Sequence, residues 1–133
     1  MDKETAGWLA NLIQEAAMEL EHNPGLTIEV DGEEEKWVQI IPEADDEGHF
    51  AGFTLNFPYR GQSGDPLITL TEHVTTPPPG SLTIGWEDGG YARLHIRQDI
   101  PLTALAFFIN DLLVKLLGAA ENPELAIRIE YGF

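Results

Sequence analysis

The sequence predicts an α+β fold, with a mostly antiparallel sheet of five to seven strands and an N-terminal and a C-terminal helix packed on one face. Two observations carry this prediction. Apolar residues recur at helical spacing over residues 3–22 and 101–117, and the stretches between them alternate apolar and polar side chains with the period of two that strands have. Helices segregated from hairpin-linked strands are typical of this class.

Length and composition indicate one folded domain over residues 1–133. Of the 133 residues, 43% are hydrophobic, and they include three Trp, six Phe and three Tyr. This apolar content is too high for a disordered acidic tail, which lacks the side chains needed to offset chain entropy. A chain of this size can bury one core.

The first helix is expected over residues 3–22. Asp2 suits the N-cap, and the helix ends at "HNPG", because Pro24 cannot continue it and Gly25 permits a left-handed turn. One face carries an apolar stripe of Trp8, Leu9, Leu12, Ile13, Ala16, Ala17 and Leu20.

The strands that follow differ in how well their inward face is specified. "LTIEV" (26–30) and "FTLNFPY" (53–59) alternate cleanly, so each has one wet face. "KWVQII" (36–41) is a further strand whose inward face stays open, since Trp37 and Ile41 compete with Val38 and Ile40.

The middle of the chain is expected to hold a loop, a strand and a connector. The loop is "RGQSGDP" (60–66), and "LITLTEH" (67–73) is predicted to be a short strand. "TTPPPG" (75–80) is a stiff extended connector, because successive prolines fix the backbone and cannot donate to a ladder.

Residues 81–98 are expected to form a hairpin with a three-residue loop, 88–90. Only this loop length puts the apolar residues of both strands on one face, namely Leu82, Ile84 and Trp86 with Ala92, Leu94 and Ile96. The same register sends Arg93, His95 and Arg97 to the outer face, with Arg93 across from Gly85.

The second helix is expected over residues 101–117, before a strand at 125–131. Its core arc is Leu102, Leu105, Ile109, Leu112, Leu113 and Leu116, and the strand turns Leu125, Ile127, Ile129 and Tyr131 inward. The opposite arc, with Phe107 and Val114, is also largely apolar. Either the first helix covers it, or it contacts another chain, which would make Phe107 and Val114 partner-binding residues and the protein a homodimer through this helix.

Charge narrows the classes of partner. The chain has 7 basic and 23 acidic residues, a net charge of −16. Such a surface repels the phosphates of nucleic acids and of anionic membranes, so we expect neither as a partner and expect a protein or peptide instead. The start "MDKETAGWLANLIQ" has no basic region before an apolar run, which predicts a cytoplasmic protein.

The scarce basic residues of the hairpin are the first candidate site. Arg93, His95 and Arg97 could hold an acidic or carboxylate-bearing partner, and the alternative is cross-strand pairing with Glu87, Glu130 and other exposed acids. His95 has no carboxylate near it in the sequence, so nothing supports a pH-switch role.

The acid-rich stretch is the second candidate. Nine acids lie between Glu29 and Glu47, opposed only by Lys36. They could dock a basic partner or be solvated turns on either side of "KWVQII". "EADDEGH" lacks the alternating acids and final bidentate acid of a calcium loop.

No pattern indicates catalysis, a metal or a cofactor. The chain has no cysteine, and its four histidines are isolated, with no pair at the i, i+4 spacing of a zinc site. No phosphate-binding loop, dinucleotide fingerprint or nucleophile elbow is found. We therefore expect a protein that is not an enzyme and has no catalytic residues, no metal and no cofactor.

Most of the chain resembles the type III secretion chaperone-like superfamily, including its YbjN branch. The resemblance rests on "WVQIIPE" and "FTLNFPY" as early strands and on "YARLHIRQDIPLTALAFFINDLL" as strand, Asp-x-Pro break and apolar helix. It implies a non-enzymatic, often dimeric protein that binds extended partner segments on an exposed sheet surface, here the face with Arg93 and Arg97 together with apolar spots on the sheet or its edges. Two differences are expected: no helix within residues 64–80, and an added strand "LAIRIEY" after the last helix.

Three functions follow as hypotheses. The first is a chaperone-like module that binds a protein or peptide. The second is an immunity or inhibitor-type acidic protein that neutralises a basic partner through "VDGEEE" and "EADDEG". The third is a small-ligand-binding domain with a cavity between sheet and helices.

Overall fold

Six strands form one antiparallel sheet in the computed structural model, which describes residues 1–132. The strand order is β4-β5-β3-β2-β1-β6, so β4 and β6 are the two edges. The elements are α1 (Lys3–Met18), a 3₁₀ turn (Leu20–His22), β1 (Pro24–Val30), β2 (Glu33–Ala44), β3 (Phe50–Pro58), α2 (Pro66–His73), β4 (Leu82–Glu87), β5 (Tyr91–Ile96), α3 (Leu102–Asp111), a π-type turn (Leu112–Leu116) and β6 (Leu125–Tyr131). The predicted α+β class is confirmed.

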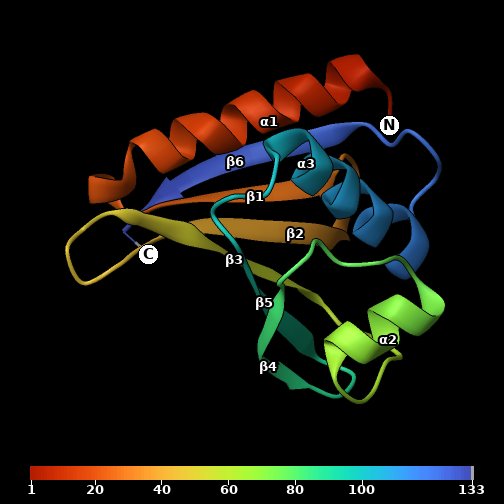
Figure 1. Cartoon of the computed structure of the whole chain (residues 1–133). Coiled ribbons are helices and arrows are strands. Elements are labelled where there is room, and N and C mark those ends of the chain that lie inside the picture. Colours follow the sequence, from red (N-terminus) through yellow and green to blue (C-terminus); the bar gives the residue numbers. More distant parts are fainter. Residues whose placement is uncertain (133) are drawn as a thin grey trace.

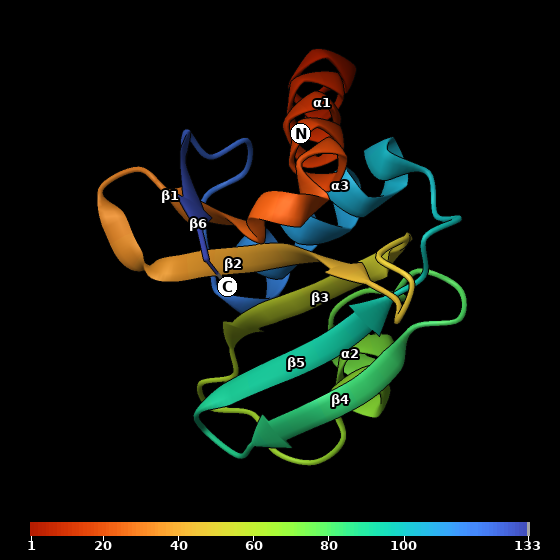
Figure 2. The same cartoon turned by 90° about the vertical axis from the view of Figure 1, so that its left-hand side faces the viewer.

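All three helices lie on the same side of the sheet. α1 runs along the β1 and β6 end and packs against α3, while α2 lies behind β4 and β5 (Figures 1 and 2). The opposite side of the sheet carries no helix (Figure 2). We call this uncovered side the outer face.

One continuous core fills the space between the helices and the inner face of the sheet. Strands β1, β2, β3 and β5 contribute alternate side chains to it: Leu26, Ile28, Val30, Val38, Ile40, Phe53, Leu55, Phe57, Ala92, Leu94 and Ile96. Val38 and Ile40 point inward, which decides the orientation that the sequence left open and turns Trp37 and Ile41 outward. α2 adds Leu70 to the same core.

The first helix begins as predicted and ends differently. The Asp2 carboxylate accepts the Thr5 backbone N–H at 2.8 Å, which is an N-cap. The α-helix stops at Met18, and Asn23, not Gly25, takes the left-handed conformation after the 3₁₀ turn, with φ of 51°. Trp8 lies at the margin of the apolar stripe and stays 47% exposed.

The prediction of a strand at residues 67–73 is wrong, because Pro66–His73 is helix α2. The Asp65 carboxylate caps the Leu67 N–H at 3.0 Å, and Pro66 occupies the first turn, where its missing N–H costs nothing. The same Asp65 oxygen accepts the Thr83 hydroxyl at 2.7 Å and so ties α2 to β4. The expected lack of a helix within residues 64–80 is therefore also wrong.

The hairpin has the predicted Arg93 to Gly85 pairing but not the predicted inward face on β4. A register shift between Thr83 and Gly85 inserts Ile84 as a bulge. Beyond the bulge Leu82 pairs with His95 instead of facing the core, and it is exposed. The expectation that Leu82 and Ile84 are buried is wrong, whereas Leu94 and Ile96 are fully buried as predicted.

The final segments also depart from the prediction in part. The last turns of the second helix are of the π type, and Ala106 and Asn110 on its second arc are buried where α1 packs.

The added strand is confirmed as β6, which pairs with β1. Ile129 and Tyr131 share the inward side but stay exposed, because β6 is an edge strand.

The Asp65 cap gives a stability prediction. Asp65→Ala removes both the cap and the Thr83 contact, so the free energy of unfolding should fall by about 1 to 2 kcal/mol, measured by urea denaturation. Asp65→Asn keeps an oxygen that can cap the helix and should cost clearly less. Equal losses for the two variants would contradict this role.

Candidate functional site

A polar row of residues crosses the outer face from one edge to the other. Backbone pairing aligns one residue from each strand: Arg128 on β6, Thr27 on β1, Gln39 on β2, Asn56 on β3, Arg93 on β5 and Gly85 on β4. The sequence indicates this row through the polar positions of strands in which polar and apolar residues alternate. Predicting the row as a whole also required the strand order.

Arg93 is held in this row by hydrogen bonds between neighbouring strands. Its Nε donates to Asn56 Oδ1 at 2.8 Å, and Asn56 Nδ2 donates to Gln39 Oε1 at 3.0 Å. The guanidinium carbon also lies 5.9 Å from the centre of the Tyr91 ring. Within residues 1–132 no carboxylate lies within 4 Å of its charged nitrogens, so Arg93 is a positioned positive charge without an ion-pair partner.

His95 has a carboxylate partner that the sequence did not reveal. Glu43 Oε2 lies 3.0 Å from His95 Nδ1, and the other oxygen of Glu43 accepts the Thr54 hydroxyl. The sequence could not reveal this partner, because Glu43 is 52 residues away from His95 in the sequence and two strands away in the sheet. This cluster sits over Gly52, which has a φ of +109°.

Arg97 lies beyond the end of β5 and is paired locally. Its Nε and a terminal guanidinium nitrogen donate to the two oxygens of Asp99 at 3.0 and 2.8 Å. The predicted cross-strand pairing with Glu87 or Glu130 is not formed by either arginine. Of the three predicted hairpin residues, Arg93 alone therefore offers a charge that a partner's carboxylate can use.

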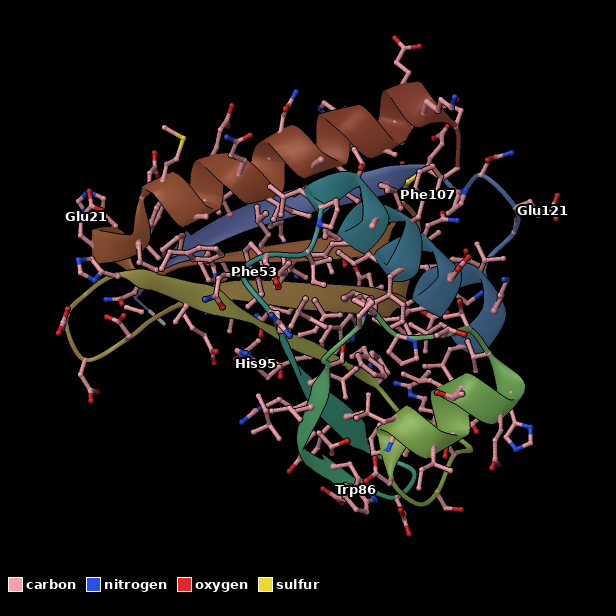
Figure 3. The ribbon with its side chains drawn as sticks, in the orientation of Figure 1. Glu21, Phe53, Trp86, His95, Phe107 and Glu121 are labelled. Atoms are coloured by element: carbon pink, nitrogen blue, oxygen red, sulfur yellow. The ribbon has the colours of Figure 1, made fainter. Side chains whose placement is uncertain are left out.

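Phe107 and Val114 belong to a different surface. Both lie on the helical side of the sheet, and Figure 3 shows Phe107 beside α3, distant from Trp86 at the β4 end. Phe107 is 38% exposed and lines an apolar hollow of about 470 Å³ between α3 and residues 75–79. Val114 is half-buried. The structure thus does not bring these residues together with Arg93, and self-association through this helix stays a prediction.

The sequence predicted apolar spots at the sheet edges as part of a binding surface but did not identify strand β4 as one. Leu82, Ile84 and Trp86 are 61%, 50% and 41% exposed on this edge strand. They were predicted to be core, and only the bulge at Ile84, which alternation cannot predict, brings Leu82 and Ile84 to the surface. Tyr91, across from Glu87 on β5, extends this exposed apolar border.

The two edges of the sheet differ in chemistry. β6 turns Arg128 and Glu130 to the outer face, and such charges discourage pairing with another strand. β4 has no charged side chain between Leu82 and Trp86, and the bulge at Ile84 is its only irregularity. Among the described residues, β4 is therefore the less charged edge, whereas its short length and its bulge are features that limit how many residues a further strand can pair with.

The acid-rich segments lie at opposite ends of the long strand β2. The first is the turn from β1 to β2, and the second is the turn from β2 to β3 (Figure 2). In the second turn the Asp45 carboxylate accepts the backbone N–H groups of His49 and Glu47, both at 2.9 Å. The hydrogen bond from His49 is the main cause that lowers the pKa of Asp45 below its ordinary value. The two acidic segments therefore do not form one docking patch.

No family model, curated protein sequence or solved structure matches the chain. Residues 1–132 contain no group of three or more histidine or acidic side chains arranged to hold a metal ion. None of the helices in this range combines the length and apolarity needed to cross a bilayer.

Gly52 and Gly85 give a matched pair of stability predictions. A Cβ at Gly52 would lie 2.3 Å from the Ile96 carbonyl oxygen, and the backbone of Gly52 is left-handed. Gly52→Ala should therefore lower the free energy of unfolding by about 2 kcal/mol or more. A Cβ at Gly85 would meet nothing within 4 Å, so Gly85→Ala should change it by about 0.5 kcal/mol at most. Guanidinium denaturation measures both, and a tolerated Gly52→Ala would refute the close approach of β3 to β5.

The Asp45 turn gives a pH prediction. Because the pKa of Asp45 is lower in the folded chain, its stabilising effect is complete above about pH 4, the ordinary range of an Asp, and is lost as the pH falls through the folded-state pKa. The difference in unfolding free energy between the wild type and Asp45→Asn should shrink as the pH falls from 6 to about 2. Asp46→Asn is the control, since the structure shows no such hydrogen bonds to Asp46. A difference that does not depend on pH would show that the charge of Asp45 plays no part.

Proposed function

We propose that the protein is a non-enzymatic, chaperone-like binding module that accepts an extended segment of a protein partner along strand β4. The observation that carries this proposal is the exposed apolar edge formed by Leu82, Ile84 and Trp86. An edge strand offers unpaired backbone N–H and C=O groups, and a partner strand can satisfy them.

The side chains of β4 supply the binding energy that backbone pairing alone lacks. Hydrogen bonds to a partner mainly replace hydrogen bonds to water, so their net contribution is about 0.5 to 1.5 kcal/mol each. Covering Leu82, Ile84 and Trp86 removes apolar surface from water, which favours association. Leu82 pairs with His95 on the outer face and Trp86 pairs with Ala92 on the helical face, so a partner strand would meet them from opposite sides of the sheet.

Arg93 provides a polar contact for the same partner. A strand added beside β4 would lie about 10 Å from β5, two strand spacings away. Gly85 lies between them in the row and has no side chain, so nothing on β4 would block the guanidinium if it left Asn56 on β3 and turned toward the edge. A carboxylate at the facing position of the partner would pair with Arg93.

The other hypotheses are less favoured by the surface. A basic partner would meet two acidic turns separated by the length of β2, not a single acidic patch. For a small-ligand role, the hollows found among the described residues have volumes of about 310 to 500 Å³ and are open to the surface, so none of them encloses a ligand. The resemblance to the type III secretion chaperone-like superfamily agrees with peptide binding on the sheet. The expected lack of a helix within residues 64–80 was a difference from that superfamily, and α2 removes this difference.

The test uses three labelled ten-residue peptides and fluorescence anisotropy at about 0.15 M salt. The first alternates Val and Thr with one central Glu, the second has Gln in place of Glu, and the third has two prolines that prevent strand pairing. We expect the Glu peptide to bind most tightly and the proline peptide not to bind, because it cannot form the ladder. Leu82→Lys with Ile84→Lys should weaken binding at least about tenfold.

Two controls make this experiment decisive. Ile129→Lys places one lysine on the β6 edge and should leave binding unchanged. Arg93→Gln should remove the preference for Glu over Gln. Circular dichroism checks that each variant is folded. Equal binding of the Glu and proline peptides, or full binding by the β4 double variant, would refute the proposal.

A further inference from the structure

A hollow of about 500 Å³ lies on the helical side of the sheet, where the start of α1, the end of α3 and the segment before β6 meet (Figure 1). The side chains that line it include Asp2, Thr5, Trp8, Asn110, Glu124 and Leu125. Because β6 and β4 are the opposite edges of the sheet, this hollow is separate from the edge proposed above.

Asn110 on α3 has a buried polar atom without a partner at this hollow. The residue is 7% exposed, and it lines both this hollow and a smaller neighbouring one of about 310 Å³. Among the described residues, its Oδ1 is the one buried side-chain oxygen or nitrogen that has no hydrogen-bond partner. Buried polar groups without a partner are rare, and they destabilise a fold. What this carbonyl oxygen lacks is a hydrogen-bond donor.

The packing of the helices does not require an amide at this position. Asn110 follows Ala106 by one turn on the side of α3 that packs against α1, and Ala106 is completely buried. An apolar side chain would fill this place without leaving an oxygen unpaired. The terminal torsion of an asparagine is broad, so the amide can turn its oxygen toward the hollow while α3 stays in place.

The groups around the Asn110 amide favour an occupant that donates hydrogen bonds and carries positive charge. Two carboxylates, those of Asp2 and Glu124, line the hollow, against the single amino group of Met1. The Asp2 carboxylate is occupied as the N-cap of α1. Glu124 forms no ion pair with a described residue, so its carboxylate is available to an occupant.

Apolar side chains form the rest of the wall. Trp8 on α1 is 47% exposed, and Leu125 at the start of β6 is half-buried. The stem of a long side chain can lie against such surfaces while its charged head reaches polar groups. Because the hollow is open to the surface, it suits a side chain that projects from another protein.

We infer that this hollow binds an arginine side chain of a partner protein. A guanidinium carries five N–H donors in one plane, so it can donate to the Asn110 oxygen and to the Glu124 carboxylate together. The stem of the arginine would lie against Trp8. The net charge of −16 favours the approach of such a group over long range. This inference does not depend on the β4 edge, since it uses other elements and the opposite charge.

The probe is N-acetyl-arginine N-methylamide, added to the ¹⁵N-labelled full chain at about 0.15 M salt. The citrulline analogue is the neutral control of nearly the same shape, and the lysine analogue has the charge without the planar group. The side-chain N–H signals of Asn110 and Trp8 report the site, and Asn110→Leu and Trp8→Phe identify them. We expect the arginine compound to shift both signals saturably, to leave those of Trp37 and Trp86 in place, and to bind more tightly than either analogue.

Variants separate this site from general attraction to an acidic protein. Asn110→Leu should weaken binding at least about tenfold, because it removes the acceptor of a hydrogen bond from a charged group. Glu124→Gln, at an exposed position, should weaken binding about two- to fivefold. Asn11→Leu and Glu72→Gln make the same changes at exposed helical positions outside the hollow and should leave binding unchanged.

The stability of Asn110→Leu distinguishes a binding role from a structural one. The variant should unfold at the same or a higher urea concentration than the wild type, because the oxygen that it removes has no partner in the chain. A clearly lower urea midpoint would overturn the inference, since the amide would then serve the fold. Equal shifts with either analogue, parallel shifts of all three tryptophans, or full binding by Asn110→Leu would also overturn it. The peptides used for β4 contain no arginine, so failure of one proposal is distinguishable from failure of the other.

Discussion

Burial of one sheet face beneath three helices is the constraint on which the rest of the molecule depends. Side chains alternate along a strand, so placing Leu94 and Ile96 in the core forces Arg93, His95 and Arg97 into water on the other side. The same rule fixes the outward direction of Trp37 once Val38 is buried. The outer face is thus polar because the inner face is apolar, and its side chains are available for binding because they contribute little to the core.

Local irregularities convert this regular sheet into a surface with distinct parts. Gly52 adopts a left-handed conformation within β3, and the missing Cβ lets the Ile96 carbonyl and the His95 ring approach. The bulge at Ile84 shifts the phase of β4 and exposes residues that an unbroken strand would bury. Natural edge strands are commonly protected by charge, as β6 is by Arg128 and Glu130. The exposed apolar border of β4 departs from this pattern, which makes it the stronger candidate for contact with a partner.

The spacing of apolar residues predicted the class of fold and the direction of most side chains, because apolar residues recur at the positions that face the core. It failed at residues 67–73, where the alternation of "LITLT" imitated a strand while the local signal, Asp65 followed by Pro66, specified a helix start. It also failed at Ile84, since a bulge depends on how two strands meet and not on either strand alone. The contact between His95 and Glu43 required the order of strands, which no local pattern contains.

Positive and negative charges lie at different ends of the polar row on the outer face, so the position of a partner determines which charges it meets. Arg93 is an unpaired positive charge on β5, whereas surplus carboxylates gather around Trp37 on β1, β2 and β6. Because β1 and β5 are three strand spacings apart, the two ends of the row are separated by about 14 Å. At physiological salt the Debye length is about 8 Å, so each end acts on a partner locally and neither cancels the other. A segment that lay along β4, parallel to the strands, would therefore meet the charge of Arg93 and not the carboxylates around Trp37.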